Sequence, residues 1–176
     1  MSDRPRTRER THVADLNKRD TALIEVMIDL FRQGQKSHHE NFPEMFGPAE
    51  DDAAIAAHLS CFFKPRNPLR KRSNFAKGWF VDGTLSGYLL FQLYEASNVY
   101  YGKTRWTCFV EDIVIDEAAR GKGGASALMG SLLAEIERLD ECAVSGTVWS
   151  GNDASIALFE KHGFHSLSQS FCRVVK

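Results

Sequence analysis

The sequence has few cysteines and no closely spaced cysteine pair. Among its 176 residues there are four, Cys61, Cys108, Cys142 and Cys172, and none forms a CxxC motif. This spacing excludes a small disulfide scaffold and the usual structural zinc sites, so we expect no metal. Scattered cysteines are also typical of reduced thiols, and we expect a cytoplasmic protein.

The sequence also lacks an excess of charge of one sign and any long apolar run. Its 22 Lys and Arg residues balance 23 Asp and Glu residues, for a net charge of −1. This balance argues against general electrostatic binding to nucleic acid. No apolar run approaches the roughly 20 residues that span a bilayer. The segment MSDRPRTRERTH lacks the apolar core of a signal peptide, so we expect no membrane association.

The length and an apolar content of 43% predict one globular domain over residues 1–176, with residues 1–9 as a flexible tail. Hydrophobic periodicity predicts strands at 11–14, 75–81, 85–94, 105–115 and 143–149, and a last strand or hairpin within 164–175. Helices are expected after Asp20, at 53–63, through 125–139 and at 152–162. Residues 34–49 contain Gly34, Pro43, Gly47 and Pro48 and are expected to form a loop with a possible short helix. Asp82-Gly83 suits a tight hairpin turn. This order predicts a mixed α/β (α+β) sheet, mostly antiparallel, with helices on both faces.

Two adjacent carboxylates interrupt the apolar strand expected at 105–115. Strict alternation places Cys108, Val110, Asp112 and Val114 on one face, and Glu111 on the other with Phe109, Ile113 and Ile115. Because an unpaired buried charge is costly, Glu111 and Asp112 need either a functional role or a basic partner.

A glycine-rich turn follows this strand and opens a helix. It reads Arg120-Gly121-Lys122-Gly123-Gly124-Ala125. The free N–H groups of a first helical turn, together with the helix dipole, favour phosphate binding. Arg120 and Lys122 add cationic donors. The Walker motif and the GxGxxG fingerprint, two other phosphate-binding motifs, do not match this sequence as well. The alternative to phosphate binding is that the turn has only a structural role.

Two motifs resemble one known family. Arg120-x-x-Gly123-x-Ala125 resembles the [Q/R]xxGx[G/A] signature of the GNAT acetyltransferase superfamily, and the block from Asn152 to Phe164 resembles its N-x-x-[AS]-x-x-[LF]-Y-x-K-x-G-F motif. The resemblance covers residues 105–165 and implies the acyl-CoA N-acyltransferase fold. The nearest pattern is that of the diamine acetyltransferases, which also carry Glu-Asp nine residues before the arginine.

The resemblance implies acetyl-CoA as co-substrate, in a cleft between the strands at 105–115 and 143–149. It implies a homodimer as well. The residues that would bind acetyl-CoA are Ile113 and Ile115 through their backbone, the turn residues Arg120, Gly121, Lys122, Gly123, Gly124 and Ala125 at the pyrophosphate, Asn152 at the pantetheine arm, and Lys161 near the nucleotide.

The implied reaction is direct attack of an amine on the thioester. An amine with a pKa of about 10.4 needs roughly 4–5 kcal/mol to lose its proton at pH 7, so a base helps. Glu111 is the first candidate, acting directly or through water. Asp112 is the reserve, since it lies on the other face unless a bulge turns the pair. The alternative is that both carboxylates only pair with Arg or Lys.

Phe159 stands where this family usually has a tyrosine that protonates the departing thiolate. Losing a general acid typically lowers the rate by about 10²–10⁴-fold. Replacements that remain open are water and the hydroxyls of Ser155, Tyr94, Tyr100 and Tyr101.

Two polar segments are further candidates. The first contains His38, His39, Glu40 and Glu44. It could line the entrance for the acceptor amine, or it could be a solvated loop. The second, Lys64 to Arg72, could bind an acidic acceptor or the phosphates of coenzyme A, or be a surface loop.

Three functions remain open. The first is an N-acetyltransferase for a small amine, the second a protein lysine or N-terminal acetyltransferase, and the third an acyl-CoA-binding sensor without catalysis, which the phenylalanine at 159 would favour.

Overall fold

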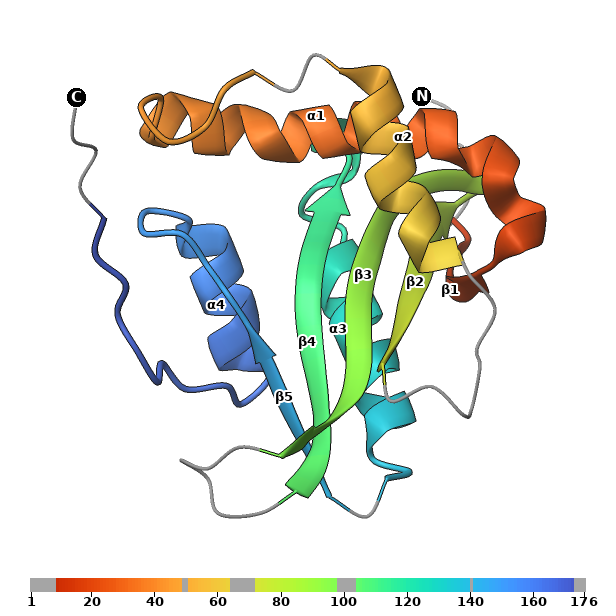
Figure 1. Cartoon of the computed structure of the whole chain (residues 1–176). Helices are drawn as coiled ribbons and strands as arrows, with labels where there is room; N and C mark the ends of the chain where they lie inside the picture. The colour runs from red at the N-terminus through yellow and green to blue at the C-terminus, as the bar shows by residue number, and fades with distance from the viewer. Residues whose placement is uncertain (1–8, 49–50, 64–71, 98–103, 140, 173–176) are drawn as a thin grey trace, which may run out of the picture.

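The computed structural model describes residues 9–48, 51–63, 72–97, 104–139 and 141–172 (Figure 1). The strands are β1 (Thr11–Leu16), β2 (Arg72–Val81), β3 (Thr84–Ser97), β4 (Thr104–Ile115) and β5 (Cys142–Gly146). The α-helices are α1 (Ile24–Asn41), α2 (Asp52–Ser60), α3 (Gly124–Ile136) and α4 (Asp153–Lys161). Three 3-10 helices join them, η1 (Lys18–Leu23), η2 (Cys61–Phe63) and η3 (Glu117–Ala119).

One mixed sheet forms the centre of the fold. Its strands run in the order β1-β2-β3-β4-β5; the first four are antiparallel, and β5 is parallel to β4. The turn between β2 and β3 has φ angles of 47° at Asp82 and 83° at Gly83, which is the left-handed conformation that a tight hairpin requires. The expected mixed, mostly antiparallel sheet is confirmed.

Helices cover both faces of this sheet, and each face has its own apolar core. On one face, Met27 and Leu30 of α1 and Leu59 of α2 pack against Tyr88 and Leu90 of β3. On the other face, which lies behind the sheet in Figure 1, the buried side chains of α3 pack against the strands. The sheet is therefore packed between two helical layers.

The expected loop at 34–49 is wrong in its first half, because α1 continues to Asn41. Gly34, which suggested a break, is where α1 crosses β4. A Cβ atom there would lie 3.1 Å from Cγ2 of Val114. Close packing of the helix on the strand therefore outweighs the low helix propensity of glycine, and α1 carries its last turn over the end of the sheet.

The expected last strand is wrong for the described part of the C-terminal segment. Residues 164–172 form no strand. Leu167 and Phe171 are 90% and 89% exposed, so this segment buries too little apolar surface to hold it on the sheet. The strand expected at 143–149 is also shorter, since β5 ends at Gly146.

A β-bulge in β4 overturns the expected alternation of its side chains. Leu90 of β3 pairs with Asp112 and Phe91 pairs with Val110, so Glu111 is the extra residue. Cys108 and Val110 belong to the core under α3, whereas Val114 belongs to the core under α1 and α2. After the bulge, the side chains that would have pointed to one face of the sheet point to the other. The bulge turns Asp112 toward α1.

Candidate active site

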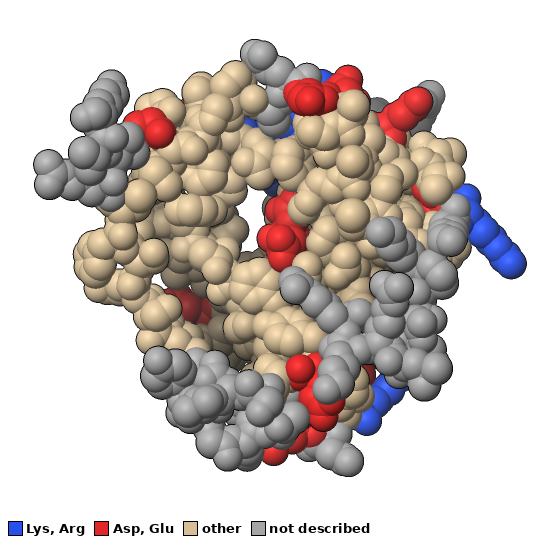
Figure 2. Space-filling model, viewed as in Figure 1, with Lys and Arg blue, Asp and Glu red and all other residues tan. Residues whose placement is uncertain are grey.

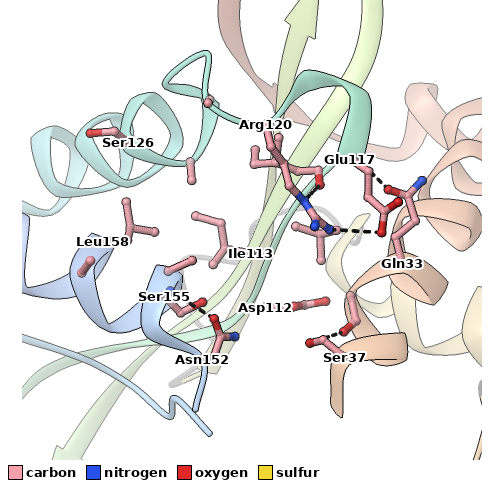
Figure 3. Close-up of a pocket in the computed structure, with 18 of the residues that line it drawn as sticks. Gln33, Ser37, Asp112, Ile113, Glu117, Arg120, Ser126, Asn152, Ser155 and Leu158 are labelled. Carbon is pink, nitrogen blue, oxygen red and sulfur yellow. Dashed lines mark hydrogen bonds and ion pairs between the residues drawn. The ribbon is translucent and has the colours of Figure 1, made fainter. Parts of the chain in front are cut away.

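A cleft of about 720 Å³ opens where β4 and β5 separate. The pairing of the two strands ends at Val110 and Gly146. Beyond that point the cleft is bounded by residues 112–115 of β4, the turn before α3, the first turns of α3 and α4, and the last turns of α1 (Figure 3). This is the position in which the family resemblance implies a cleft for acetyl-CoA.

The glycines of the turn serve two different purposes. Gly121 and Gly123 have φ angles of 76° and 84°, and a Cβ atom at either would meet no atom within 4 Å. Their backbone therefore faces open space at the amino end of α3. Gly124 is buried, and a Cβ atom there would lie 2.5 Å from the ring of Trp79. It allows α3 to pack closely on the sheet.

Of the residues predicted to bind acetyl-CoA, all but one line this cleft. The guanidinium Nε of Arg120 donates to the carbonyl of Ile115 at 3.3 Å. Lys122 is the exception, because its Nζ pairs with Glu9 at 2.8 Å and its side chain is not among the lining. The members that the cleft brings together are Ile113, Ile115, Arg120, Gly121, Gly123, Gly124, Ala125, Asn152 and Lys161.

The amino end of α4 closes one side of the cleft. The side-chain oxygen of Asn152 accepts a hydrogen bond from the backbone N–H of Ser155 at 3.1 Å and caps the helix. In Figure 3, Asp112 lies between Asn152 on one side and Ser37 of α1 on the other. Asp112 therefore stands at the point where α1, α4 and β4 converge.

A second cavity of about 290 Å³ adjoins the cleft. Five residues line both of them, namely His38, Asp112, Ile113, Asn152 and Ser155. Four aromatic side chains line the second cavity, those of Phe31, Phe46, Trp149 and Phe159, together with His58 and Glu111. No Lys or Arg occurs among the described residues that line it. Figure 2 shows a hollow in the face of the molecule that is turned toward the viewer, and acidic side chains lie at the wall of this hollow.

Asp112 has the electrostatic environment of a proton acceptor. Its carboxylate accepts a hydrogen bond from the hydroxyl of Tyr88, at 2.7 Å from Oδ2. Burial raises the pKa of Asp112 to about 6, although the bond from Tyr88 acts in the opposite direction. Burial, and then the charge of Asp112, also raise the pKa of Tyr88. A carboxyl with a pKa near 6 can both take up and release a proton close to neutral pH.

The two carboxylates predicted to be catalytic lie in different places. Asp112 lines both cavities, whereas Glu111 is exposed on the bulge and lines only the smaller one. Within the described part of the chain, neither forms an ion pair with Lys or Arg.

Phe159 is a packing residue of the smaller cavity. A Cβ atom on Gly146 would lie 2.8 Å from Cζ of Phe159, and the ring also packs against Phe164 with centroids 4.9 Å apart. Of the hydroxyls that could replace the missing tyrosine, that of Ser155 belongs to a residue lining both cavities, and Tyr94 lines neither. Tyr100 and Tyr101 lie outside the described residues.

The first polar segment is helical as far as Asn41 and contributes to the site, whereas Glu44 lies in the turn that follows. His38 lines both cavities, its ring lies 5.5 Å from that of Phe46 and 6.1 Å from that of Trp149, and burial lowers its pKa. His39 instead contacts the carbonyl oxygen of Phe46 through Nδ1 at 2.6 Å. Glu40 lines the larger cleft, whereas Glu44 lines neither cavity. The basic segment from Lys64 lies almost wholly outside the described residues.

Sequence reasoning missed Tyr88 and His58. Both reach the site from elements that are distant in sequence, β3 and α2. The one available signal was the hydroxyl of Tyr88 in an otherwise apolar run, since a buried hydroxyl needs a hydrogen-bond partner.

Comparison with known proteins decides the family. Residues 16–164 match the Acetyltransferase (GNAT) family. The chain belongs to this family. The family prediction is thereby confirmed, and with it the acetyltransferase class of enzyme at the level of the family.

One curated relative is the Bacillus subtilis (strain 168) protein named "Putative phosphinothricin acetyltransferase YwnH". It is 35% identical over 95 residues, which are 49% of this chain. The match spans 58% of that relative's length. Its name does not support the diamine subfamily, which is not confirmed.

Solved structures share the fold. The BH1408 protein of Bacillus halodurans, as a tetramutant, has a TM-score of 0.70 at 16% identity, covering 93% of this chain and 99% of that one. Aminoglycoside N-acetyltransferase AAC(6')-Iy, in complex with CoA, has a TM-score of 0.68 at 16% identity and covers 98% of each chain. Within the described residues, no helix is long and apolar enough to cross a bilayer. No group of three or more His, Cys, Asp and Glu side chains in that part of the chain could hold a metal ion.

Proposed function

We propose that the chain is an acetyl-CoA-dependent N-acetyltransferase that acts on a primary amine by direct attack, as a single domain over residues 1–176. A small molecule is the favoured acceptor. The observation that carries this proposal is the junction at Asp112, where a large cleft with cationic residues meets a small acidic and aromatic cavity.

The larger cleft fits acetyl-CoA. The open backbone at Gly121 and Gly123, at the amino end of α3, suits a pyrophosphate, and Arg120 and Lys161 supply positive charge. Ile113 and Ile115 lie on the stretch of β4 beyond the pairing with β5, where their backbone could bind the pantetheine arm. The co-substrate supplies an activated acetyl thioester, and the chain positions it.

Asp112 is the better candidate for the base. It lies where the amine and the thioester would meet, and its pKa of about 6 is nearer to neutral pH than that of an ordinary carboxyl. Glu111 faces only the acceptor cavity. We assign to Glu111 the binding of the positively charged acceptor, and to Asp112 the removal of its proton.

The smaller cavity favours a compact, cationic acceptor. Its volume lies at the lower end of the roughly 300–1,000 Å³ typical of ligand pockets. Glu111 and Asp112 supply negative charge, and the rings of Trp149 and Phe46 can hold a cation over their faces. This lining fits a diamine better than it fits phosphinothricin, which carries a carboxylate and a phosphinate. A protein lysine is the alternative acceptor, because its side chain is also a flexible primary amine.

The decisive experiment follows thiol release from acetyl-CoA with a panel of monoamines, diamines, amino acids and lysine peptides. We expect turnover with diamines to exceed turnover with acidic amino acids. Asp112→Asn should abolish most turnover while coenzyme A affinity persists, and Glu111→Gln should chiefly raise the KM for the amine. Gly123→Val should remove coenzyme A binding, because it places a side chain in the open space that the ligand would need.

Three outcomes would count against the proposal. Coenzyme A binding without turnover on any amine would favour the acyl-CoA sensor. Turnover confined to peptides would favour the protein acceptor. Undiminished coenzyme A affinity in a folded Gly123→Val variant would contradict the assignment of the cleft.

The cytoplasmic location and the homodimer belong to the same proposal. The location is supported by the four cysteines, Cys61, Cys108, Cys142 and Cys172, since none of them forms a disulfide. The homodimer rests on the family resemblance, and sedimentation of the purified protein would test it.

A further inference from the structure

His38 stands at the junction of the two cavities. It lies in the last turn of α1, and the N–H of Phe42 caps the helix by donating to its carbonyl oxygen at 2.9 Å. The imidazole is half-buried and packs against the rings of Phe46 and Trp149. Among the described residues, none forms a hydrogen bond with either ring nitrogen. The ring is therefore held in place by packing, and its nitrogens are available to a substrate.

The proposed reaction must move two protons away from the acceptor nitrogen. A protonated amine carries three hydrogens, and the amide product keeps one. The first proton leaves before attack, and Asp112 can pass it to solvent. The second leaves during attack, while the departing sulfur needs one proton to become a thiol. During the attack, nitrogen and sulfur are bonded to the same carbon. One group at the junction could therefore take the proton from nitrogen and give it to sulfur.

We propose that His38 is the catalytic residue that carries this second proton from the amine nitrogen to the thiolate sulfur. This inference rests on the proposed function. In this step the C–N bond forms, and the neutral imidazole takes the proton of the attacking nitrogen. The C–S bond then breaks, its electron pair stays on sulfur, and the imidazolium returns the same proton to that sulfur. The products are the amide and the thiol, and His38 ends neutral as it began.

The electrostatics of His38 suit both halves of this transfer. Burial lowers the pKa of His38 from its ordinary value, which favours the neutral imidazole that can accept a proton. The carboxyl end of α1 is the negative end of the helix dipole and stabilises the imidazolium once it forms. An imidazolium, with a pKa of about 6.5, is a stronger acid than a thiol of about 8.5, so transfer to sulfur is favourable.

The other groups at the junction are less suitable for transferring this proton. Asn152 has no titratable proton, and the hydroxyl of Ser155 is too weak a base to take a proton from the amine. The hydroxyl of Tyr88 is fully buried and already donates to Asp112. Phe159 has no proton to give. The charged or titratable side chains that line the same two cavities are Lys36, Glu40, His58, Glu111, Asp112, Glu117, Arg120 and Lys161.

Chemical rescue tests the proposal. Thiol release is measured at saturating acetyl-CoA, with the amine that the wild-type protein uses best, in wild type and His38→Ala, with increasing imidazole. We expect His38→Ala to lower kcat by about 10²–10⁴-fold and to leave the KM for acetyl-CoA within about threefold. Added imidazole should restore kcat in a saturable manner. His12→Ala is the matched control: His12 is exposed on β1 and stacks on Phe80, so it should show neither effect.

The variant His38→Gln tests whether a loss of activity in His38→Ala comes only from a change in structure. Glutamine fills similar space but cannot accept a proton, so the variant should keep the wild-type melting temperature and lose the same activity. The proposal is overturned if His38→Gln keeps kcat within about threefold, or if imidazole restores nothing to His38→Ala. Failure of the wild-type protein to turn over any amine would instead count against the proposed function.

Discussion

Asp112→Asn should make the protein more stable while it removes activity. The pKa of Asp112 is about 6 in the folded chain, against 3.8 for an ordinary Asp side chain. Since burial raises the pKa, the folded state disfavours the ionised carboxylate, and the protein is destabilised above the folded pKa. At roughly 1.4 kcal/mol per pKa unit, the gap between 3.8 and 6 corresponds to about 3 kcal/mol at pH 8. Asparagine keeps an oxygen for the hydroxyl of Tyr88 without the charge.

Denaturant unfolding at several pH values measures this effect. The free energy of unfolding of Asp112→Asn should exceed that of wild type by about 3 kcal/mol at pH 8. The difference should shrink as the pH falls from 6 toward 3.8 and vanish below about pH 3, where the Asp112 carboxyl is protonated in the folded and the unfolded chain alike. Glu111→Gln is the matched control, because Glu111 is exposed and should change stability little at any pH. A less stable Asp112→Asn at pH 8, or a difference that does not depend on pH, would refute the reasoning.

Three further substitutions test other contacts. Tyr88→Phe removes a donor that lowers the pKa of Asp112, so the acidic limb of the kcat/KM profile should move to higher pH; an unmoved limb would show that another group titrates there. Gly124→Ala places a Cβ atom 2.5 Å from the ring of Trp79, so urea unfolding should show a loss of about 1–3 kcal/mol. Lys77→Met leaves two carboxylates, 2.6 and 3.0 Å from its buried Nζ, without this partner, and thermal unfolding should show a loss of about 1–3 kcal/mol.

The elements as far as α4 follow the predicted order, and nine of the ten residues that the family resemblance implies for acetyl-CoA binding line one cleft. Short-range patterns encode both, since the amphipathic stripe of α3, the glycine turn and the cap at Asn152 each lie within one segment. The exception in the cleft is Lys122. Its pairing with Glu9 joins residues 113 positions apart, and no local pattern indicates it.

The bulge at Glu111 explains why the roles proposed for the two carboxylates differ from those that strict alternation favours. Strict alternation places Glu111 and Asp112 on opposite faces of the strand, and it makes Glu111 the base. An extra residue in β4 depends on the pairing with β3 rather than on the local sequence, so periodicity does not show it. The bulge brings Asp112 to the junction of the two cavities and leaves Glu111 in the smaller one.

The smaller cavity also lies beyond sequence reasoning. Its lining comes from α1, α2, β4, α4 and the segments that follow α1 and β5. Gly34 decides much of this, because it lets α1 continue across β4 and carry His38 to the junction. In the sequence, a glycine at this position favours a loop. The close approach of α1 to Val114, which the absence of a side chain at Gly34 permits, explains why the helix continues.

The most direct test of the site is a crystal structure with a bisubstrate ligand, in which an amine is joined to coenzyme A through an acetyl linker. The pyrophosphate should lie on the turn from Arg120 to Ala125, the arm between β4 and β5, and the amine nitrogen within hydrogen-bond reach of Asp112, directly or through one water. An amine nitrogen that lies beside Glu111 and out of reach of Asp112, or a coenzyme bound outside the opening between β4 and β5, would contradict the assignment of the two cavities.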